Sequence, residues 1–278
     1  MKIIIFGSNG MLGNYVKTFL TQKKYEIIAL TRKDFDLCNI NIIELDIFMK
    51  KINLMENDII INCCGIIPQS SAYRNVNKQM YYKINSIFPI ILSSICDKYN
   101  VKMIHITTDC VFSGKNGNYN ENSVHDEIND YGVSKSLGEL CKATIIRTSI
   151  IGEEIYNKCS LLEWVKSNYN GKINGFNNHY WNGVTCLELS KIIDNIIINN
   201  NFWVGVRHIH SPNKVSKYEL VKMINDVYNL NIKINELETE IIDKSLCTIY
   251  DLNKFNVLEL HEQIKELKYF NINTFFEQ

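Results

Sequence analysis

Proline, unbalanced charge and long apolar runs are all scarce in this sequence. Only three prolines occur in 278 residues, and no Gly/Ser-rich linker or low-complexity tract interrupts the chain, so a folded core is expected throughout. No stretch approaches the ~20 consecutive apolar residues of a membrane-spanning helix. The apolar start, residues 1–7, is soon interrupted by glycine and polar residues. We therefore expect no export signal, no membrane partner and a cytoplasmic location.

Charge balance and cysteine spacing exclude further classes of protein. Thirty basic and thirty acidic residues cancel, which leaves no overall field to attract nucleic acid. Nine cysteines are scattered without a C-x-x-C pair, so reduced thiols are expected rather than a zinc or redox centre. His208 and His210 could form a metal pair, but no carboxylate cluster accompanies them. We favour a structural role for both and predict no metal.

The first half of the chain alternates strand-like and helix-like segments. Apolar residues recur every three or four positions most clearly over 77–99, which predicts a helix there. This alternation is typical of a parallel sheet with helices on both faces. The predicted strands are Lys2–Phe6, Glu26–Leu30, Asp58–Asn62, Lys102–Ile106 and Thr144–Arg147.

The second half has a looser pattern. We predict helices over 161–168, 186–199 and 216–228, the last with a capping box, and a short strand over 206–209. The simplest architecture is an α/β fold in which a doubly wound parallel sheet over residues 1–150 binds a cofactor. A smaller α/β lobe over residues 151–278, interleaved with the first, binds the substrate.

A glycine-rich turn joins the first predicted strand to the first predicted helix. The stretch "IIIFGSNGMLG" places Gly7, Gly10 and Gly13 there. Glycines in this position let the turn tighten and the backbone approach a pyrophosphate at the helix N-terminus. Because a strand precedes the motif and a helix follows it, a Rossmann-type dinucleotide site is favoured over a purely structural turn.

The end of the second predicted strand bears on the choice of cofactor. Thr31 and Arg32 stand where NAD-specific folds usually place an acidic residue on the ribose hydroxyls. A guanidinium suits a 2′-phosphate, so NADPH is predicted, with NADH as the alternative. Arg32 pointing into solvent is the competing interpretation.

Two further stretches carry groups suited to proton transfer. Tyr131 and Lys135 in "DYGVSKSLGE" are four residues apart, which puts both side chains on one face of a helix. The lysine ammonium is expected to lower the pKa of the tyrosine, which could then exchange a proton near neutral pH. In "HITTDCVFSG", the fourth predicted strand ends at threonines, where ligands bind in an open α/β sheet.

Taken in order, these motifs resemble those of the extended short-chain dehydrogenase/reductases, and most closely the dTDP-4-dehydrorhamnose reductase family. The resemblance covers nearly the whole chain and is strongest over the first 150 residues. It implies hydride transfer from a nicotinamide to the C4 ketone of a nucleotide-diphosphate sugar. The motifs are "FGSNGMLG", "DFDLCN", "DIIINCCG", "ITTDCVFSG", "NYNE", "DYGVSKSLGE", "IIRTSIIG" and "WNGVTCLELSKII".

The resemblance also implies a role for individual residues. Thr108 would hydrogen-bond the substrate carbonyl, Tyr131 would protonate it, and Lys135 would hold the nicotinamide ribose. Asp109 would reach the sugar. The remaining cofactor residues would be Gly10, Met11 and Leu12 at the pyrophosphate, Asp36 and Leu37 at the adenine, and Cys64, Gly65 and Ile66 along the ribose side.

The departures from the family pattern all fall on the substrate side. Ile150 stands where the family usually has tryptophan, and Lys244 where it usually has arginine. The stretch "IIPQSSAYRN" replaces an expected Val-Asp-x-x-Glu segment. A UDP-linked 2-acetamido-2,6-dideoxy-4-ketohexose is therefore weighed beside the dTDP-rhamnose precursor. Trp181 could stack on a nucleotide base or pack in the core.

Cys110 suggests an alternative activity. GDP-fucose synthase, in the same superfamily, has an epimerising cysteine two residues after its catalytic serine, as Cys110 follows Thr108. A thiol of lowered pKa could exchange a proton next to the C4 ketone, with Cys159 or His179 on the opposite face. A bifunctional epimerase/reductase is therefore one alternative. A non-catalytic NADP-binding regulatory subunit is another, against which the intact proton-transfer residues argue. We expect a homodimer.

Overall fold

The computed structural model describes residues 1–69 and 77–272. Within them, a six-stranded sheet has the order β10-β5-β4-β3-β1-β2, and its pairs are all parallel. The predicted α/β fold with a doubly wound parallel sheet is confirmed. The strands are β1 (Lys2–Phe6), β2 (Glu26–Leu30), β3 (Ile59–Asn62), β4 (Lys102–Thr108), β5 (Thr144–Thr148) and β10 (Gly205–His208).

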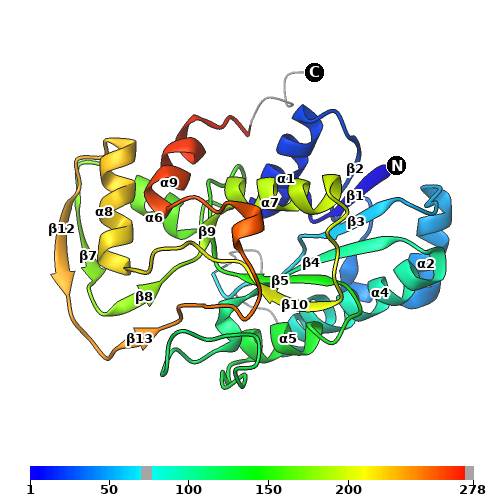
Figure 1. Ribbon diagram of the computed structural model, residues 1–278, viewed down its shortest axis with the longest axis horizontal. Coiled ribbons are helices and arrows are strands. Elements are labelled where there is room, and N and C mark those ends of the chain that lie inside the picture. The colour runs from blue at the N-terminus through cyan, green and yellow to red at the C-terminus, as the bar shows by residue number, and fades with distance from the viewer. Residues whose placement is uncertain (70–76, 273–278) are drawn as a thin grey trace.

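Helices cover both faces of this sheet (Figure 1). On one face lie α1 (Met11–Gln22) and α7 (Cys186–Ile198); on the other lie α2 (Ile42–Lys51), α4 (Phe88–Tyr99) and α5 (Asp130–Gly138). Because strand side chains alternate, Ile3 and Ile5 belong to one buried cluster and Ile4 and Phe6 to the other. A sheet buried on both faces explains why its strands are nearly continuous apolar runs.

The second half of the chain adds a strand and a helix to the six-stranded sheet and its helix layer, and it also forms a smaller lobe of its own. Strand β10 pairs with β5, with Val206 opposite Ile145. Helix α7 packs along α1, and the Tyr25 hydroxyl donates to Asp194 on α7 at 2.9 Å. The chain therefore returns to the sheet after leaving it at β5.

The smaller lobe lies at the other end of the molecule (Figure 1). Its strands form short pairs, β7 with β12, β6 with β9, and β8 with both β11 and β13. Its elements are β6 (Ile150–Ile151), α6 (Leu161–Ser167), β7 (Lys172–Phe176), β8 (His179–Trp181), β9 (Val184–Thr185), β11 (Val215–Ser216), α8 (Lys217–Tyr228), β12 (Lys233–Leu237), β13 (Ile242–Asp243) and α9 (Leu260–Tyr269).

The helix predicted over 77–99 is present, but it contains a wider turn that was not predicted. The helical stretch runs through α3 (Lys78–Tyr81), a π-helical turn η3 (Tyr82–Ile87) and α4. The wider turn carries Asn85, which accepts from the Ile66 N–H at 2.9 Å and donates to Ser134 at 3.0 Å. Periodicity could not predict the π turn, because such a turn often serves a specific contact with another part of the fold.

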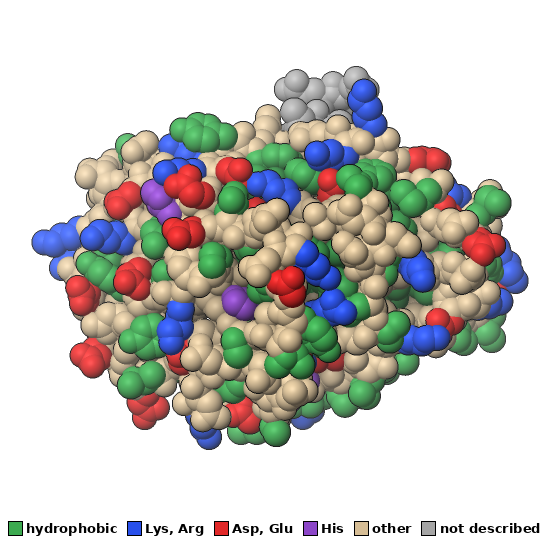
Figure 2. All heavy atoms as spheres, viewed as in Figure 1, with side chains coloured by type: hydrophobic (Ala, Val, Ile, Leu, Met, Phe, Trp, Pro, Cys, Tyr) green, Lys and Arg blue, Asp and Glu red, His purple; other side chains and the backbone are tan. Residues whose placement is uncertain are grey.

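The surface carries both signs of charge. Figure 2 shows acidic and basic side chains interspersed over the face in view. In the part of the chain that the structure describes, no helix has the length and apolar character that crossing a bilayer requires.

Candidate active site

The glycine loop adopts a conformation that depends on its glycines. Gly7 has φ of +75°, where side chains other than glycine are strained. A Cβ on Gly13 would lie 2.1 Å from the Gly7 carbonyl oxygen, so α1 could not approach the loop so closely. Gly10 caps α1 without a side-chain hydrogen bond. The first N–H groups of α1 thus remain available to an anion, as a pyrophosphate site requires.

A cavity of about 350 Å³ lies beside this loop, at the carboxyl ends of β1, β2 and β3. Its lining includes nine residues predicted to bind the cofactor, which are Gly7, Gly10, Thr31, Arg32, Asp36, Leu37, Cys64, Gly65 and Ile66. Met11, Leu12 and Gly13 form the first turn of α1 next to it. A cleft of this shape, with a glycine cradle at one end, fits a dinucleotide.

Eight of the lining residues were not predicted to bind the cofactor, among them Phe35, Tyr156 and Asn157. Phe35 follows β2, whereas Tyr156 and Asn157 come from the second half of the chain. Of these three, Phe35 alone could have been inferred from the sequence, as a hydrophobic residue near the adenine end of the cleft. Tyr156 and Asn157 lie in an irregular stretch without any periodic signal.

The rim of this cleft carries a cation and a carboxylate. The pKa of Asp36 is lowered, first by its hydrogen bond with Cys38 and also by the positive charge of Arg32. Thr31 turns instead to Asp34, to which its hydroxyl donates at 2.7 Å. Of Thr31 and Arg32, the two residues that follow β2, it is therefore Arg32 whose positive charge acts at the cleft.

The residues predicted to transfer a proton come together where β4 ends against α5. The Tyr131 phenol lies close enough to the Thr108 hydroxyl to interact with it. One helical turn later, the Lys135 Nζ donates to the Ile106 carbonyl at 2.9 Å. A Cβ on Gly65 would lie only 3.8 Å from this Nζ. Since Gly65 lines the cavity, Lys135 stands at the boundary between the cofactor cleft and the proton-transfer group.

The predicted effect of the lysine on the tyrosine is wrong for this arrangement. Burial raises the pKa of Tyr131 above its ordinary value, and the charge of Cys110 adds to the rise. Burial also lowers the pKa of Lys135 to about 8. Desolvation is the largest cause of both shifts, because both groups are removed from water. Tyr131 therefore remains a neutral phenol at physiological pH, which is the form that donates a proton.

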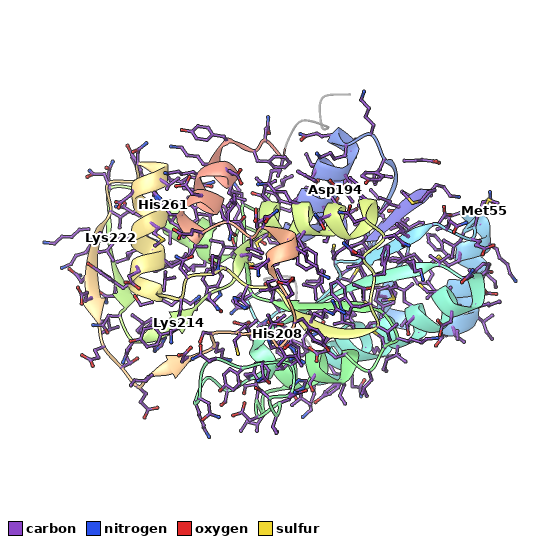
Figure 3. The ribbon with its side chains drawn as sticks, in the orientation of Figure 1. Met55, Asp194, His208, Lys214, Lys222 and His261 are labelled. Atoms are coloured by element: carbon purple, nitrogen blue, oxygen red, sulfur yellow. The ribbon has the colours of Figure 1, made fainter. Side chains whose placement is uncertain are left out.

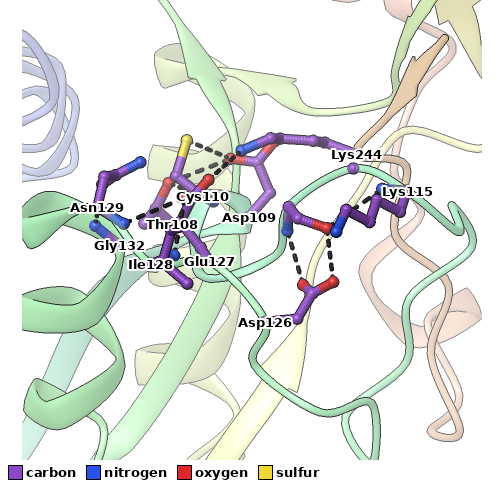
Figure 4. Close-up of polar contacts among 12 residues, drawn as sticks. Thr108, Asp109, Cys110, Lys115, Asp126, Glu127, Ile128, Asn129, Gly132 and Lys244 are labelled. Carbon is purple, nitrogen blue, oxygen red and sulfur yellow. Dashed lines mark hydrogen bonds and ion pairs between the residues drawn. The ribbon is translucent and has the colours of Figure 1, made fainter.

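Asp109 and Cys110 form a hydrogen-bonded group next to Thr108 (Figure 4). The Thr108 hydroxyl donates to Asp109 at 3.1 Å, and the Cys110 thiol lies 3.5 Å from the same oxygen. Burial, followed by the charge of Asp109, raises the pKa of Cys110 to about 12. The lowered thiol pKa that the epimerase alternative requires is thus contradicted by the structure.

The predicted substrate residues are spread over the second lobe. Ile150 is half-buried on β6, and the His179 ring stacks on Phe176 at 4.2 Å between centroids. Lys244 pairs with Glu127 at 3.4 Å, close to Asp109 (Figure 4). Trp181 is only 3% exposed and belongs to the larger buried cluster. The packing interpretation of Trp181 is therefore favoured over stacking on a base.

Two other features singled out from the sequence lie elsewhere. Cys159 donates its N–H to Glu154 in the loop before α6. The stretch 66–75 that departs from the family pattern lies outside the described residues from position 70 onward.

A buried network of polar side chains joins the end of α5 to the neighbouring strands of the sheet. Arg147 is 2% exposed and forms an ion pair with Glu139. Its guanidinium also lies 2.7 Å from the Nε2 atoms of both His208 and His125. Burial lowers the pKa of His208 to about 4, so this imidazole is neutral. The structural interpretation of His208, which is labelled in Figure 3, is supported, since its ring contacts the side chain of Arg147 and so joins β10 to β5.

A parallel sheet, a glycine cradle at its first helix and a Tyr-x-x-x-Lys pair beside a threonine define the class. These features are those of an extended short-chain dehydrogenase/reductase fold. The family model described as "RmlD substrate binding domain" matches residues 1–243. The chain belongs to this family.

Relatives and solved structures agree with this placement. A dTDP-4-dehydrorhamnose reductase from Aggregatibacter actinomycetemcomitans is 26% identical over 239 residues, covering 81% of this chain and 78% of its own. The spore coat polysaccharide biosynthesis protein SpsK of Bacillus subtilis is 31% identical over 155 residues, covering 53% of this chain and 52% of its own. The crystal structure of a Bacillus anthracis dTDP-4-dehydrorhamnose reductase in complex with NADP has a TM-score of 0.80 at 22% identity, covering 96% of this chain and 98% of the other.

Proposed function

We propose that this protein reduces the C4 ketone of a nucleotide-linked 4-keto-6-deoxyhexose with NADPH. The observation that carries the proposal is the meeting of Thr108, Tyr131 and Lys135 at the edge of a cleft with a glycine cradle. Relatives named as dTDP-4-dehydrorhamnose reductases and a dTDP-4-keto-6-deoxy-D-glucose reductase support the same reaction.

The cofactor cleft fits NADPH in its donor groups. The open N–H groups at the start of α1 suit the pyrophosphate, and Arg32 offers a cation to the 2′-phosphate. The bound cofactor supplies a hydride to the sugar C4 atom. Lys135 would hold the ribose next to that reaction, because its ammonium borders Gly65 in the cleft.

Three side chains would then act on the carbonyl oxygen of the substrate. Tyr131, neutral because burial raises its pKa, would donate its proton to that oxygen as negative charge develops there. Thr108, whose hydroxyl donates to Asp109 in the structure, would turn that hydroxyl to donate a second hydrogen bond to the same oxygen. Asp109, next in the chain, would accept from a sugar hydroxyl. In reduction, a protonated phenol is the required starting form.

The substrate side supports only a coarser assignment of the sugar. We propose that Ile150, His179 and Lys244 contribute to it and that residues 151–278 hold the nucleotide-sugar while 1–150 hold the cofactor. A UDP-linked 2-acetamido sugar is proposed beside a dTDP-linked one, because Ile150 and Lys244 depart from the family pattern. The raised pKa of Cys110 argues for reduction without epimerisation.

Two further properties belong to the proposal. Ile87, Ile90, Leu137 and Leu140 are exposed large apolar residues at the π turn, α4 and α5, and we propose that this surface joins two copies in a homodimer. Light scattering during gel filtration would test it, and a monomer at micromolar concentration would contradict it. The cysteines among the described residues form no disulfide, which suits a reducing, cytoplasmic location.

A small substrate panel tests the reaction itself. The protein is incubated with NADPH and with 4-keto-6-deoxyhexoses linked to dTDP, UDP or GDP, including the 2-acetamido form. Consumption of NADPH is followed by absorbance, and NMR of the product identifies the new C4 carbinol. Tight NADPH binding without oxidation of NADPH by any of these ketones would favour the non-catalytic regulatory subunit instead.

A further inference from the structure

Lys217 is a cation at the substrate side that the reaction described so far does not use. It is the first residue of α8, directly after the capping residue Ser216. Strand β11, which ends at Ser216, pairs antiparallel with β8 and sets Val215 opposite Trp181. The Lys217 Nζ consequently lies over the Trp181 ring, 4.8 Å from its centroid.

The same ammonium faces the loop that carries the proton-transfer group. It interacts electrostatically with Asp109 and Cys110, the two residues after Thr108. Lys244 approaches Asp109 from a different segment and is itself paired with Glu127. Lys217 thus stands within the electrostatic reach of the site, on the substrate lobe, rather than on the outer surface.

Lys217 differs from the neighbouring lysine in forming no close ion pair within the described part of the chain, although Asp109 acts on its charge from a greater distance. Lys214, three residues earlier, lies 5.0 Å from the Tyr180 ring centroid and pairs with Asp243 at 3.0 Å. Among the residues that the structure describes, no carboxylate lies within ion-pair distance of the Lys217 Nζ. Burial lowers the pKa of Lys217, although Asp109 opposes this shift. A desolvated ammonium without a direct partner favours an anion that arrives with the ligand.

The class of substrate restricts what that anion can be. In a nucleotide-linked 4-keto-6-deoxyhexose, the hydroxyl, ketone and acetamido groups are neutral. The diphosphate alone is anionic, and its sugar-side phosphate is one pyranose ring away from the reacting C4 atom. An ammonium near Asp109 but not hydrogen-bonded to it is suited to that phosphate.

We propose that Lys217 is a substrate-binding residue that contacts the phosphate attached to the sugar, with Trp181 holding the ammonium in position. This proposal rests on the proposed function for the identity of the ligand. Loss of a charge-assisted hydrogen bond weakens binding by about 10- to 100-fold. The effect falls on substrate affinity rather than on proton transfer.

The test compares Lys217→Met with Lys214→Met, since both residues are lysines placed over an aromatic ring of β8. Isothermal titration of the NADPH-loaded protein with dTDP and with UDP measures binding without turnover. We expect Lys217→Met to weaken the preferred nucleoside diphosphate about 10- to 100-fold and Lys214→Met to leave it unchanged. In the reductase assay, Lys217→Met should raise KM by a similar factor with a much smaller change in kcat.

Further outcomes separate the possible failures. Lys217→Arg, which keeps the charge, should retain most of the affinity if the contact is ionic. Unchanged nucleoside diphosphate affinity in Lys217→Met, whether its KM rises or its melting temperature alone falls, would overturn the phosphate contact. If no ketone is reduced but Lys217→Met still weakens nucleoside diphosphate binding, the proposed reaction fails and the phosphate contact stands.

Discussion

The cofactor cleft and the proposed substrate side of this protein are formed by different kinds of residues. The cleft is formed largely by backbone, glycine and apolar or thiol side chains from three short segments, 6–10, 30–37 and 63–66. The substrate side gathers charged groups from distant segments, namely Asp109, Lys217 and Lys244. Backbone geometry tolerates few substitutions, whereas side chains that separate segments contribute one by one can change independently of one another. We infer that binding of the dinucleotide is the more strongly constrained of the two.

Replacing Tyr131 with phenylalanine should have the largest effect, and this effect should be limited to the proton-transfer step. Loss of the phenol next to Thr108 removes the proposed proton donor, so kcat should fall about 10²- to 10⁴-fold, while NADPH affinity and melting temperature change little. The control is Tyr81→Phe, because the Tyr81 ring lies edge-on to Tyr131, 6.4 Å away. Intact turnover in Tyr131→Phe would refute the mechanism.

Replacing Arg32 with alanine tests the cofactor side of the comparison. Since the guanidinium would pair with the 2′-phosphate, KM for NADPH should rise about tenfold and KM for NADH should not change. Lys33→Ala removes the neighbouring exposed cation and serves as the control. Equal use of NADH and NADPH by the wild-type protein, unaltered in Arg32→Ala, would show that Arg32 does not select the cofactor.

The pH profile tests the residue at the boundary between the two regions. Burial lowers the pKa of Lys135 to about 8, so its positive charge is present below that pH and is lost as the pH rises through it. We expect kcat/KM for NADPH to fall about tenfold per pH unit above that point. Tyr131, with a raised pKa, adds no step at lower pH.

Lys135→Arg identifies the group responsible, because a guanidinium remains protonated over this range. Whatever activity this variant retains should lose the decline near pH 8 that Lys135 produces. A decline at the same pH in both proteins would assign it to another residue.

The smallest effect is expected for the thiol of Cys110. Because its pKa is raised to about 12, it should not exchange protons next to the ketone at neutral pH. Substrate incubated with the protein in D₂O without NADPH should therefore gain no deuterium at C3 or C5. Deuterium that appears with the wild-type protein and disappears in Cys110→Ser would restore the epimerase alternative.

Local sequence patterns predicted the elements whose residues strongly favour one backbone conformation. Strands β1 and β2 have the predicted bounds, and the capping box at Ser216 and Glu219 is present at the start of α8. The π turn at Asn85 was missed, because it serves a contact with Ile66 across the fold. The pKa directions of Tyr131 and Cys110 were also missed, since burial is a property of the packed structure.

The sequence by itself determined the alternation that makes a parallel sheet, the glycines that bring α1 against β1, and the order of Thr108, Tyr131 and Lys135. These depend on neighbours within one turn or one strand, where covalent geometry limits the outcome. Only the tertiary structure decided that Tyr131 stays protonated and that Lys217 reaches Asp109 from the other lobe. Desolvation and long-range charge depend on which segments pack together, and no local pattern contains that information.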